Sequence, residues 1–336
     1  MKGMKSAQGI FLTIKLGREC NLKCLHCHDR CGGEYELTQQ TLDWISSQNV
    51  RILRFVGGEP FLYFDAIKRI VGCLHTDPVI RIVTNGTLLT KEQIAFINER
   101  NIQIIVSYDG KESARDASIP IRWDLVSQCR NKGIASHASL SNDVAKVNRD
   151  IRELSQKNNL GIVNDCFVRF VHETGKTGSL KSKAEIQAYI ASMKETIESQ
   201  LVAFVELSDN RIKTSFGFVT LFSAIEEWLE PKEFHGTACC NPTRMTITPD
   251  GRIMSCTYGT EYCGTVTKGI DTTKLDKMIH AKCGNCRLLR VCKTSCIDNI
   301  TRNECVIALS MNRFLIELGK KHGADLIFLL NQWRKS

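Results

Sequence analysis

The stretch Cys20-Asn21-Leu22-Lys23-Cys24-Leu25-His26-Cys27 decides how the rest of this chain is interpreted. Its cysteines have the spacing C-x3-C-x2-C and follow a short apolar segment that predicts a strand. Three thiolates at this spacing can bind three irons of a cubane [4Fe–4S] cluster and leave the fourth iron open. An open metal position is where a substrate or cofactor binds. The alternatives are half of a zinc site and a chance cluster of cysteines.

The composition is that of a large globular chain with many cysteines. The 336 residues are 43% hydrophobic and 24% charged, which allows a main domain and a smaller second one. The net charge is +9 without a long basic block, so we expect no nucleic-acid partner. No apolar run is long enough for a signal peptide or a membrane span. We therefore expect a cytoplasmic protein, away from the membrane, whose sixteen cysteines include metal ligands and not disulfides.

Short β-rich segments alternate with helical segments from residue 10 onward. We expect strands at 11–16, 51–56, 79–83, 102–106, 134–140 and 162–171, and helices at 38–48, 63–74, 91–100, 123–131, 147–156 and 183–199. Such alternation predicts an α/β fold with parallel strands. The loops after the first four strands are polar and contain glycine. Because the carboxyl ends of parallel strands meet at one edge, these loops are expected to form one site.

With the loops aligned, residues 10–175 resemble the radical S-adenosylmethionine (SAM) superfamily. The resemblance rests on the three cysteines, on Gly57-Gly58-Glu59-Pro60, on Thr84-Asn85-Gly86 and on Ser107-Tyr108-Asp109-Gly110. It implies a partial (β/α)6 barrel in which SAM chelates the open iron. It also implies reductive cleavage of SAM to a 5′-deoxyadenosyl radical that removes a hydrogen from the substrate. A flavodoxin- or ferredoxin-type protein is the electron donor that this chemistry implies.

The resemblance assigns the SAM contacts to the ends of the strands. The glycines of Gly57-Gly58-Glu59-Pro60 would let backbone carbonyls approach the SAM amino group, and Glu59 would add a charged acceptor. Arg122 would pair with the SAM carboxylate, and His26 would stack on the adenine in place of the usual large aromatic residue. The complete set implied is Gly57, Gly58, Glu59, Pro60, Asn85, Ser107, Asp109, Arg122, His26 and Val168, with Cys20, Cys24 and Cys27 on the cluster.

A second cysteine-rich region between Cys239 and Cys305 resembles the SPASM extension of radical SAM enzymes that modify peptides. The segment Thr248-Pro249-Asp250-Gly251 predicts a hairpin turn between two of its cysteines. A zinc knuckle is the alternative. The resemblance implies two auxiliary [4Fe–4S] clusters, the nearer on Cys240, Cys256 and Cys296 and the distal on Cys283, Cys286, Cys292 and Cys305. The candidates for a fourth ligand of the nearer cluster are Cys239, Cys263, His235 or no residue.

The expected organisation is a partial barrel at 1–200, a bridging segment at 201–235, a SPASM domain at 236–306 and a C-terminal helical tail at 307–336. Three further cysteines are candidate hydrogen donors to a substrate radical: Cys166, Cys263 and Cys31. For Cys166, the alternative is a small buried apolar side chain. Cys31 has the alternative of a plain loop cysteine.

The leading functional hypothesis is a maturase of a ribosomally made peptide that forms an oxidative cross-link. The alternatives are a peptide epimerase with a donor cysteine, a formylglycine-forming sulfatase maturase, and a dehydrogenase or epimerase of a sugar or other small molecule. A zinc- or cluster-dependent binding module is the hypothesis outside enzymes. Because the sequence begins close to the first strand, we expect that a separate protein, or the barrel itself, recognises any peptide leader.

Overall fold

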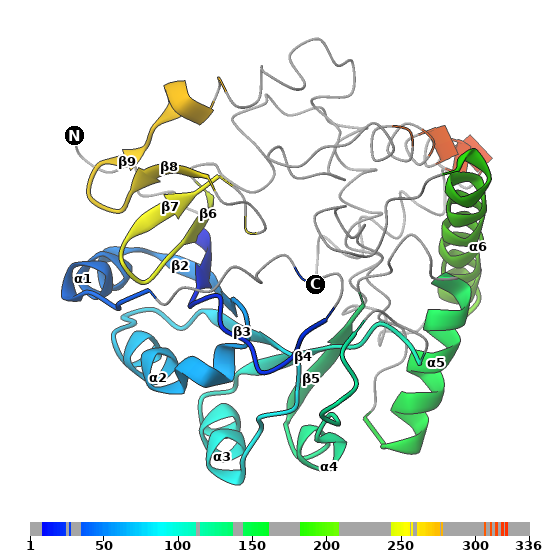
Figure 1. Cartoon of the computed structure of the whole chain (residues 1–336), viewed down its shortest axis with the longest axis horizontal. Coiled ribbons are helices and arrows are strands. Elements are labelled where there is room, and N and C mark those ends of the chain that lie inside the picture. Colours follow the sequence, from blue (N-terminus) through cyan, green and yellow to red (C-terminus); the bar gives the residue numbers. More distant parts are fainter. Residues whose placement is uncertain are drawn as a thin grey trace.

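The first half of the chain forms a curved parallel sheet with helices along one face, as the computed structural model in Figure 1 shows. The structure describes residues 9–24, 27, 35–111, 115–136, 144–160, 182–207, 243–255, 257, 261–275 and 277, with single positions between 306 and 321. The helical elements are α1 (Gln39–Ser47), the 3-10 helix η1 (Pro60–Tyr63), α2 (Phe64–Gly72), α3 (Lys91–Glu99), α4 (Trp123–Val126), α5 (Val144–Lys157) and α6 (Lys183–Leu207).

Nine strands form one sheet in the order β5-β4-β3-β2-β1-β6-β7-β8-β9. The strands from β5 to β6 in this order are parallel, and the remaining pairs are antiparallel. This arrangement confirms the α/β class. The strands are β1 (Ile10–Lys15), β2 (Val50–Val56), β3 (Val79–Thr84), β4 (Gln103–Ser107), β5 (Asn131–Ala135), β6 (Arg244–Ile247), β7 (Arg252–Met254), β8 (Tyr262–Thr265) and β9 (Gly269–Ile270).

The strands β2, β3 and β4 each have one buried apolar face and one face that is mostly partly exposed. In β3, Ile80 and Ile82 are buried, whereas the alternating residues Arg81 and Val83 are partly exposed. Successive side chains of a strand point to opposite faces, so Arg81 lies on the face opposite Ile80 and Ile82. The buried face packs with apolar residues of α1 to α4, which line the outside of the sheet in Figure 1. We call the opposite face, which carries Arg81, the inner face.

Local sequence signals explain where the helices begin. The Thr38 hydroxyl accepts a hydrogen bond from Thr41 N at 3.2 Å and so caps the start of α1. Thr90 and Gln93 form a capping box at the start of α3, with reciprocal bonds of 3.3 and 3.0 Å. The predicted strands at 11–16, 51–56, 79–83 and 102–106 and the first three predicted helices agree with the structure to within two residues at every end.

The predicted boundary between the fourth helix and the fifth strand is wrong. The helix expected at 123–131 ends at Val126, and the strand expected from 134 begins at Asn131. The segment Asn131–Ala135 has low intrinsic strand propensity, but it pairs residue by residue with β4 from Gln103 to Ser107. Pairing with a neighbouring strand outweighs local propensity here. The sixth strand expected at 162–171 lies outside the described residues.

The C-terminal region joins the main sheet through β6, which pairs in parallel with β1. The predicted turn between β6 and β7 is confirmed, because Gly251 has a φ of 83° and its N–H donates to Thr248 O at 2.9 Å. The predicted domain boundaries stay predictions. Of the C-terminal tail, the structure describes isolated helical positions, among which Phe314 and Leu318 are buried. No helix in the described part of the chain is both long and apolar enough to cross a membrane.

Candidate active site

The cysteine loop starts where β1 ends, and its thiols accept hydrogen bonds from N–H groups. Cys20 Sγ accepts from Leu22 N at 3.4 Å and from Asn85 Nδ2 at 3.6 Å. Cys24 Sγ accepts from Asp116 N at 3.3 Å. N–H donors directed at sulfur stabilise the thiolate form and tune iron–sulfur clusters. This donor set therefore fits cysteines that bind a cluster.

Cys27 closes the loop, since its N–H donates to Cys24 O at 3.2 Å. Cys20, Cys24 and Cys27 are all free thiols. Among the residues that the structure describes, no three His, Cys, Asp or Glu side chains converge on a single metal ion. The cysteines of a cubane cluster bind separate irons, so they need not converge on one point. Burial raises the pKa of the Cys20 thiol, and the negative charge of Glu59 raises it further. The hydrogen bonds from Leu22 and Asn85 lower this pKa, but the net shift is upward.

The loop after β2 packs against the backbone that leads into the cysteine loop. Gly58 N donates to Gly17 O at 3.0 Å, and Glu59 N donates to Glu19 O at 2.8 Å. Gly57 has a φ of 150°, a conformation that favours glycine. A Cβ on Gly58 would overlap the backbone carbonyl of Glu19. The two glycines, expected to bring the backbone close to SAM, thus bring it close to the chain's own first loop.

Glu59 connects the ends of β2 and β3 from a fully buried position. Its Oε1 accepts from Phe61 N at 3.1 Å and from Thr84 Oγ1 at 2.7 Å, and its Oε2 accepts from Asn85 N at 2.7 Å. Burial raises the pKa of this carboxyl, and the three donors oppose the rise. Glu59 therefore holds the Asn85 loop in place, whether or not it also receives a SAM ammonium.

Asn85 extends this network to the cysteine loop. Its Nδ2 donates to Asn21 Oδ1 at 2.8 Å, and Asn21 Nδ2 donates to Thr87 Oγ1 at 2.8 Å. Asn85 Oδ1 accepts a hydrogen bond from Thr87 N at 2.9 Å. The sequence prediction included Asn85 and missed Asn21 and Thr87, which stand beside predicted residues in the same two loops.

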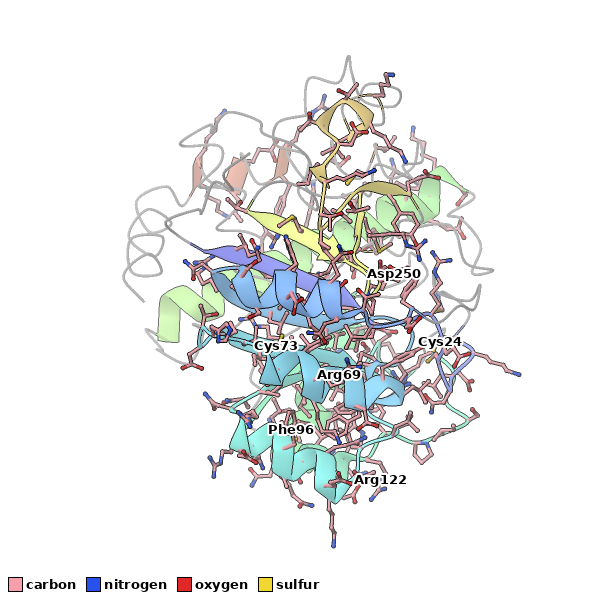
Figure 2. The ribbon with its side chains drawn as sticks, turned by 90° about the vertical axis from the view of Figure 1, so that its left-hand side faces the viewer. Cys24, Arg69, Cys73, Phe96, Arg122 and Asp250 are labelled. Atoms are coloured by element: carbon pink, nitrogen blue, oxygen red, sulfur yellow. The ribbon has the colours of Figure 1, made fainter. Side chains whose placement is uncertain are left out.

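Arg115 bridges the ends of β3 and β4. Its Nη1 donates to Ser107 O and its Nη2 to Asn85 O, both at 2.6 Å. Arg122, the arginine expected here, instead donates to both oxygens of Asp124 at 3.0 and 2.8 Å, with 46% of its side chain exposed. Figure 2 shows Arg122 apart from Cys24. No sequence pattern distinguishes Arg115 from Arg122, because the bonds of Arg115 are to backbone carbonyls.

Comparison with known proteins identifies this arrangement. Residues 14–122 match the radical SAM superfamily. These residues form a radical SAM domain, and the members of this superfamily are enzymes. Enzymes of this superfamily use a [4Fe–4S] cluster and SAM, so Cys20, Cys24 and Cys27 of the radical SAM domain are the candidate cluster ligands.

The similarity to known proteins extends beyond the radical SAM domain. The chain is 24% identical to the GTP 3′,8-cyclase of Chlorobaculum tepidum, over 76% of this chain and 83% of that protein. It is 22% identical to the radical SAM cyclopropyl synthase TigE of Paramaledivibacter caminithermalis, over 87% of this chain and 68% of that protein. The solved structure of native anSMEcpe with bound AdoMet and Cp18Cys peptide superposes with a TM-score of 0.63, at 17% identity, over 96% of this chain and 99% of that chain. That superposition establishes a shared fold.

Hydrogen bonds and ring contacts connect the hairpin of β6 and β7 to the cysteine loop of the radical SAM domain. Lys15, buried at the end of β1, donates from Nζ to Thr257 O at 3.3 Å. Arg252 stacks on Tyr35 and Tyr262 at 5.4 and 4.3 Å. Arg18 Nε donates to Tyr35 Oη at 3.1 Å, which connects the stack to the cysteine loop. Residue 257 directly follows the predicted ligand Cys256, so these contacts bring the sequence neighbour of that ligand to the end of β1.

Other predicted site residues fall into two groups. Asp109 and Pro60 are buried after β4 and at the start of η1, and Cys263 is fully buried in β8 within the apolar core. Their roles stay predictions. The second group lies outside the described residues and comprises Cys31, Cys166, Val168, His26, Cys239, Cys240, Cys256, Cys283, Cys286, Cys292, Cys296 and Cys305.

Proposed function

We propose that this radical SAM enzyme modifies a ribosomally made peptide and forms an oxidative cross-link. The observation that carries the proposal is the likeness to the peptide-bound anSMEcpe structure along almost the whole length of both chains. The 22% identity with a cyclopropyl synthase supports an oxidative bond-forming reaction. The cysteine pattern between Cys239 and Cys305 supports it further, because forming a bond with loss of two hydrogens needs an electron acceptor.

The residues have distinct roles in this proposal. Bound SAM and its cluster would supply the 5′-deoxyadenosyl radical. Cys20, Cys24 and Cys27 would bind the cluster, and the loops carrying Gly57–Pro60, Asn85, Ser107 and Asp109 would hold SAM. Arg115 acts as a positioning residue, because its guanidinium connects the carbonyls of Asn85 and Ser107. His26 and Val168 would contact the adenine.

The C-terminal cysteines would bind two auxiliary clusters that accept the second electron from the substrate. The contact between Lys15 and Thr257 supports a place near the active site for the cluster on Cys240, Cys256 and Cys296. The remaining four thiols would bind the distal cluster. A flavodoxin- or ferredoxin-type protein would deliver the first electron, and a separate protein could present a peptide leader.

The test is the mass of a peptide encoded beside the gene after anaerobic co-expression in deuterated water. A loss of two hydrogens is the expected result and indicates a cross-link or dehydrogenation. The Cys24→Ala variant is the control and should leave the peptide unmodified. A gain of one carbon-bound deuterium without oxidation would replace this proposal by epimerisation, with Cys31, Cys166 and Cys263 as candidate donors. An unmodified peptide beside active enzyme would contradict the proposal.

A nucleotide substrate is the second candidate, and the 24% identity with a GTP 3′,8-cyclase over 76% of this chain favours it. The reduced enzyme is incubated with GTP and SAM, and consumption of GTP is measured by chromatography. GTP consumption that depends on SAM would support this candidate. Unchanged GTP together with a modified peptide would leave the peptide maturase.

A further inference from the structure

The inner face of the sheet carries two arginines side by side. Arg54 in β2 and Arg81 in β3 are register partners on neighbouring parallel strands. Adjacent strands lie about 4.8 Å apart, so the two side chains start from neighbouring points on the same face. Like charges directly opposite one another destabilise a sheet. An arrangement of this kind therefore needs a compensating partner.

Arg54 has a described partner, because its guanidinium lies 5.4 Å from the centre of the Phe11 ring. Arg244 of β6 stacks on the same ring at 4.6 Å. A cation over an aromatic face is held in a defined position. Phe11 thus contacts two guanidinium groups on the inner face.

Arg81 has no such partner within the described part of the chain. Its Nε is buried and donates no hydrogen bond, and no described carboxylate forms an ion pair with it. Burial lowers the pKa of this guanidinium. A cation that loses water without gaining an anion is unfavourable. A guanidinium without an anionic partner in the protein is expected where a bound ligand supplies the negative charge.

The position of Arg81 relative to the SAM loops indicates which ligand this is. Arg81 precedes Thr84, a partner of Glu59, by three residues of β3. At about 3.3 Å per residue, the two positions are about 10 Å apart along the strand. Between them on the inner face lies an apolar pair of register partners, Val83 and Ile105. A molecule that extends from the strand ends along this face would first contact the apolar pair Val83 and Ile105. It would then reach the arginines.

We propose that Arg54 and Arg81 bind a carboxylate of the substrate, supplied by an aspartate or glutamate side chain of the peptide. This proposal rests on the proposed peptide substrate. Guanidinium groups bind carboxylates through paired N–H donors, and two of them on adjacent strands can each bind one oxygen. The carboxylate would neutralise the charge of the partly buried Arg81 side chain. The site would select peptides with an acidic residue near the residue that reacts.

The test measures thermal unfolding of the full-length, cluster-loaded protein at constant ionic strength. The probes are N-acetyl-aspartyl amide and its neutral isostere N-acetyl-asparaginyl amide, with tripolyphosphate as a third arm. The aspartyl probe should raise the Tm of the wild type, and the asparaginyl probe should not. Arg81→Met should abolish this shift and, because it removes a partly buried charge with no described anionic partner, raise the Tm of the probe-free protein by about 2 °C. Arg51→Met is the matched control on β2, because Arg51 is exposed and should leave both values unchanged.

Equal aspartyl shifts in the wild type and in Arg81→Met, or no shift in either, would overturn the proposal. A shift with tripolyphosphate alone would overturn the carboxylate assignment in favour of a phosphate-bearing substrate. The measurement involves no turnover. Failure of peptide modification would therefore leave the anion shift intact, whereas loss of the shift in an enzyme that modifies peptides would reject the arginine site alone.

Discussion

Replacing Gly58 by alanine should disrupt the packing of the Gly57–Pro60 loop against the cysteine loop. The added Cβ would overlap the Glu19 carbonyl and lie 2.7 Å from the Arg18 carbonyl carbon. Both obstacles are backbone, so no side-chain rotation relieves them. The loop must retreat, and the bonds from Gly58 N and Glu59 N, at 3.0 and 2.8 Å, are then lost. At about 0.5–1.5 kcal/mol per hydrogen bond, the free energy of unfolding should fall by about 1–3 kcal/mol.

The assay is thermal unfolding of the cluster-loaded protein, combined with its iron content and its rate of 5′-deoxyadenosine formation. We expect the Tm of Gly58→Ala to fall by about 1–4 °C and the 5′-deoxyadenosine rate to fall with it. Gly72→Ala is the matched control, because nothing lies within 4 Å of its added Cβ at the end of α2. Gly72→Ala should be neutral or slightly stabilising. A Gly58→Ala protein with the Tm and rate of the wild type would refute the reasoning.

Two further predictions concern the arginines and a buried thiol. Arg115→Met should weaken SAM binding, measured by equilibrium dialysis, and lower the free energy of unfolding by about 2–3 kcal/mol, since it removes the donors to Asn85 O and Ser107 O. Arg122→Met, which loses an exposed ion pair, should change that free energy by about 0.5 kcal/mol or less, and the reverse order would contradict the assignment. Burial raises the pKa of Cys129 to about 11, so its thiolate forms only as the pH rises towards that value. At pH 8 iodoacetamide should label Cys129 far more slowly in the folded than in the denatured protein, and equal rates would contradict its burial.

The sequence was sufficient to predict the parts of the site that depend on short contiguous motifs. The cysteine spacing, the Gly57–Pro60 loop and the polar residues after β3 and β4 each follow a strand directly, so the parallel topology alone brings them to one edge. The packing and hydrogen-bond partners of these residues could not be predicted from the sequence. The glycines contact the chain's own backbone, and the three donors to Glu59 come from η1 and from the end of β3.

Features that depend on long-range pairing could not be predicted in this way. The parallel pairing of β6 with β1 joins distant parts of the sequence and leaves no local signal. Arg115 binds carbonyl oxygens, which every residue has, so its partners impose no residue type. The short α4 and the early start of β5 depend on pairing with β4, which outweighs the low strand propensity of Asn131–Ala135.

The most direct test of the account is the formation of 5′-deoxyadenosine from SAM by the cluster-loaded protein after chemical reduction. The account predicts that the wild type forms 5′-deoxyadenosine and that Cys24→Ala forms none, because Cys24 belongs to the thiol set at the end of β1. Cys73→Ala is the control, since Cys73 lies at the end of α2 and should retain the activity. Production by Cys24→Ala at the wild-type rate, or none by a wild-type protein that carries its full iron content, would contradict the assignment of this site.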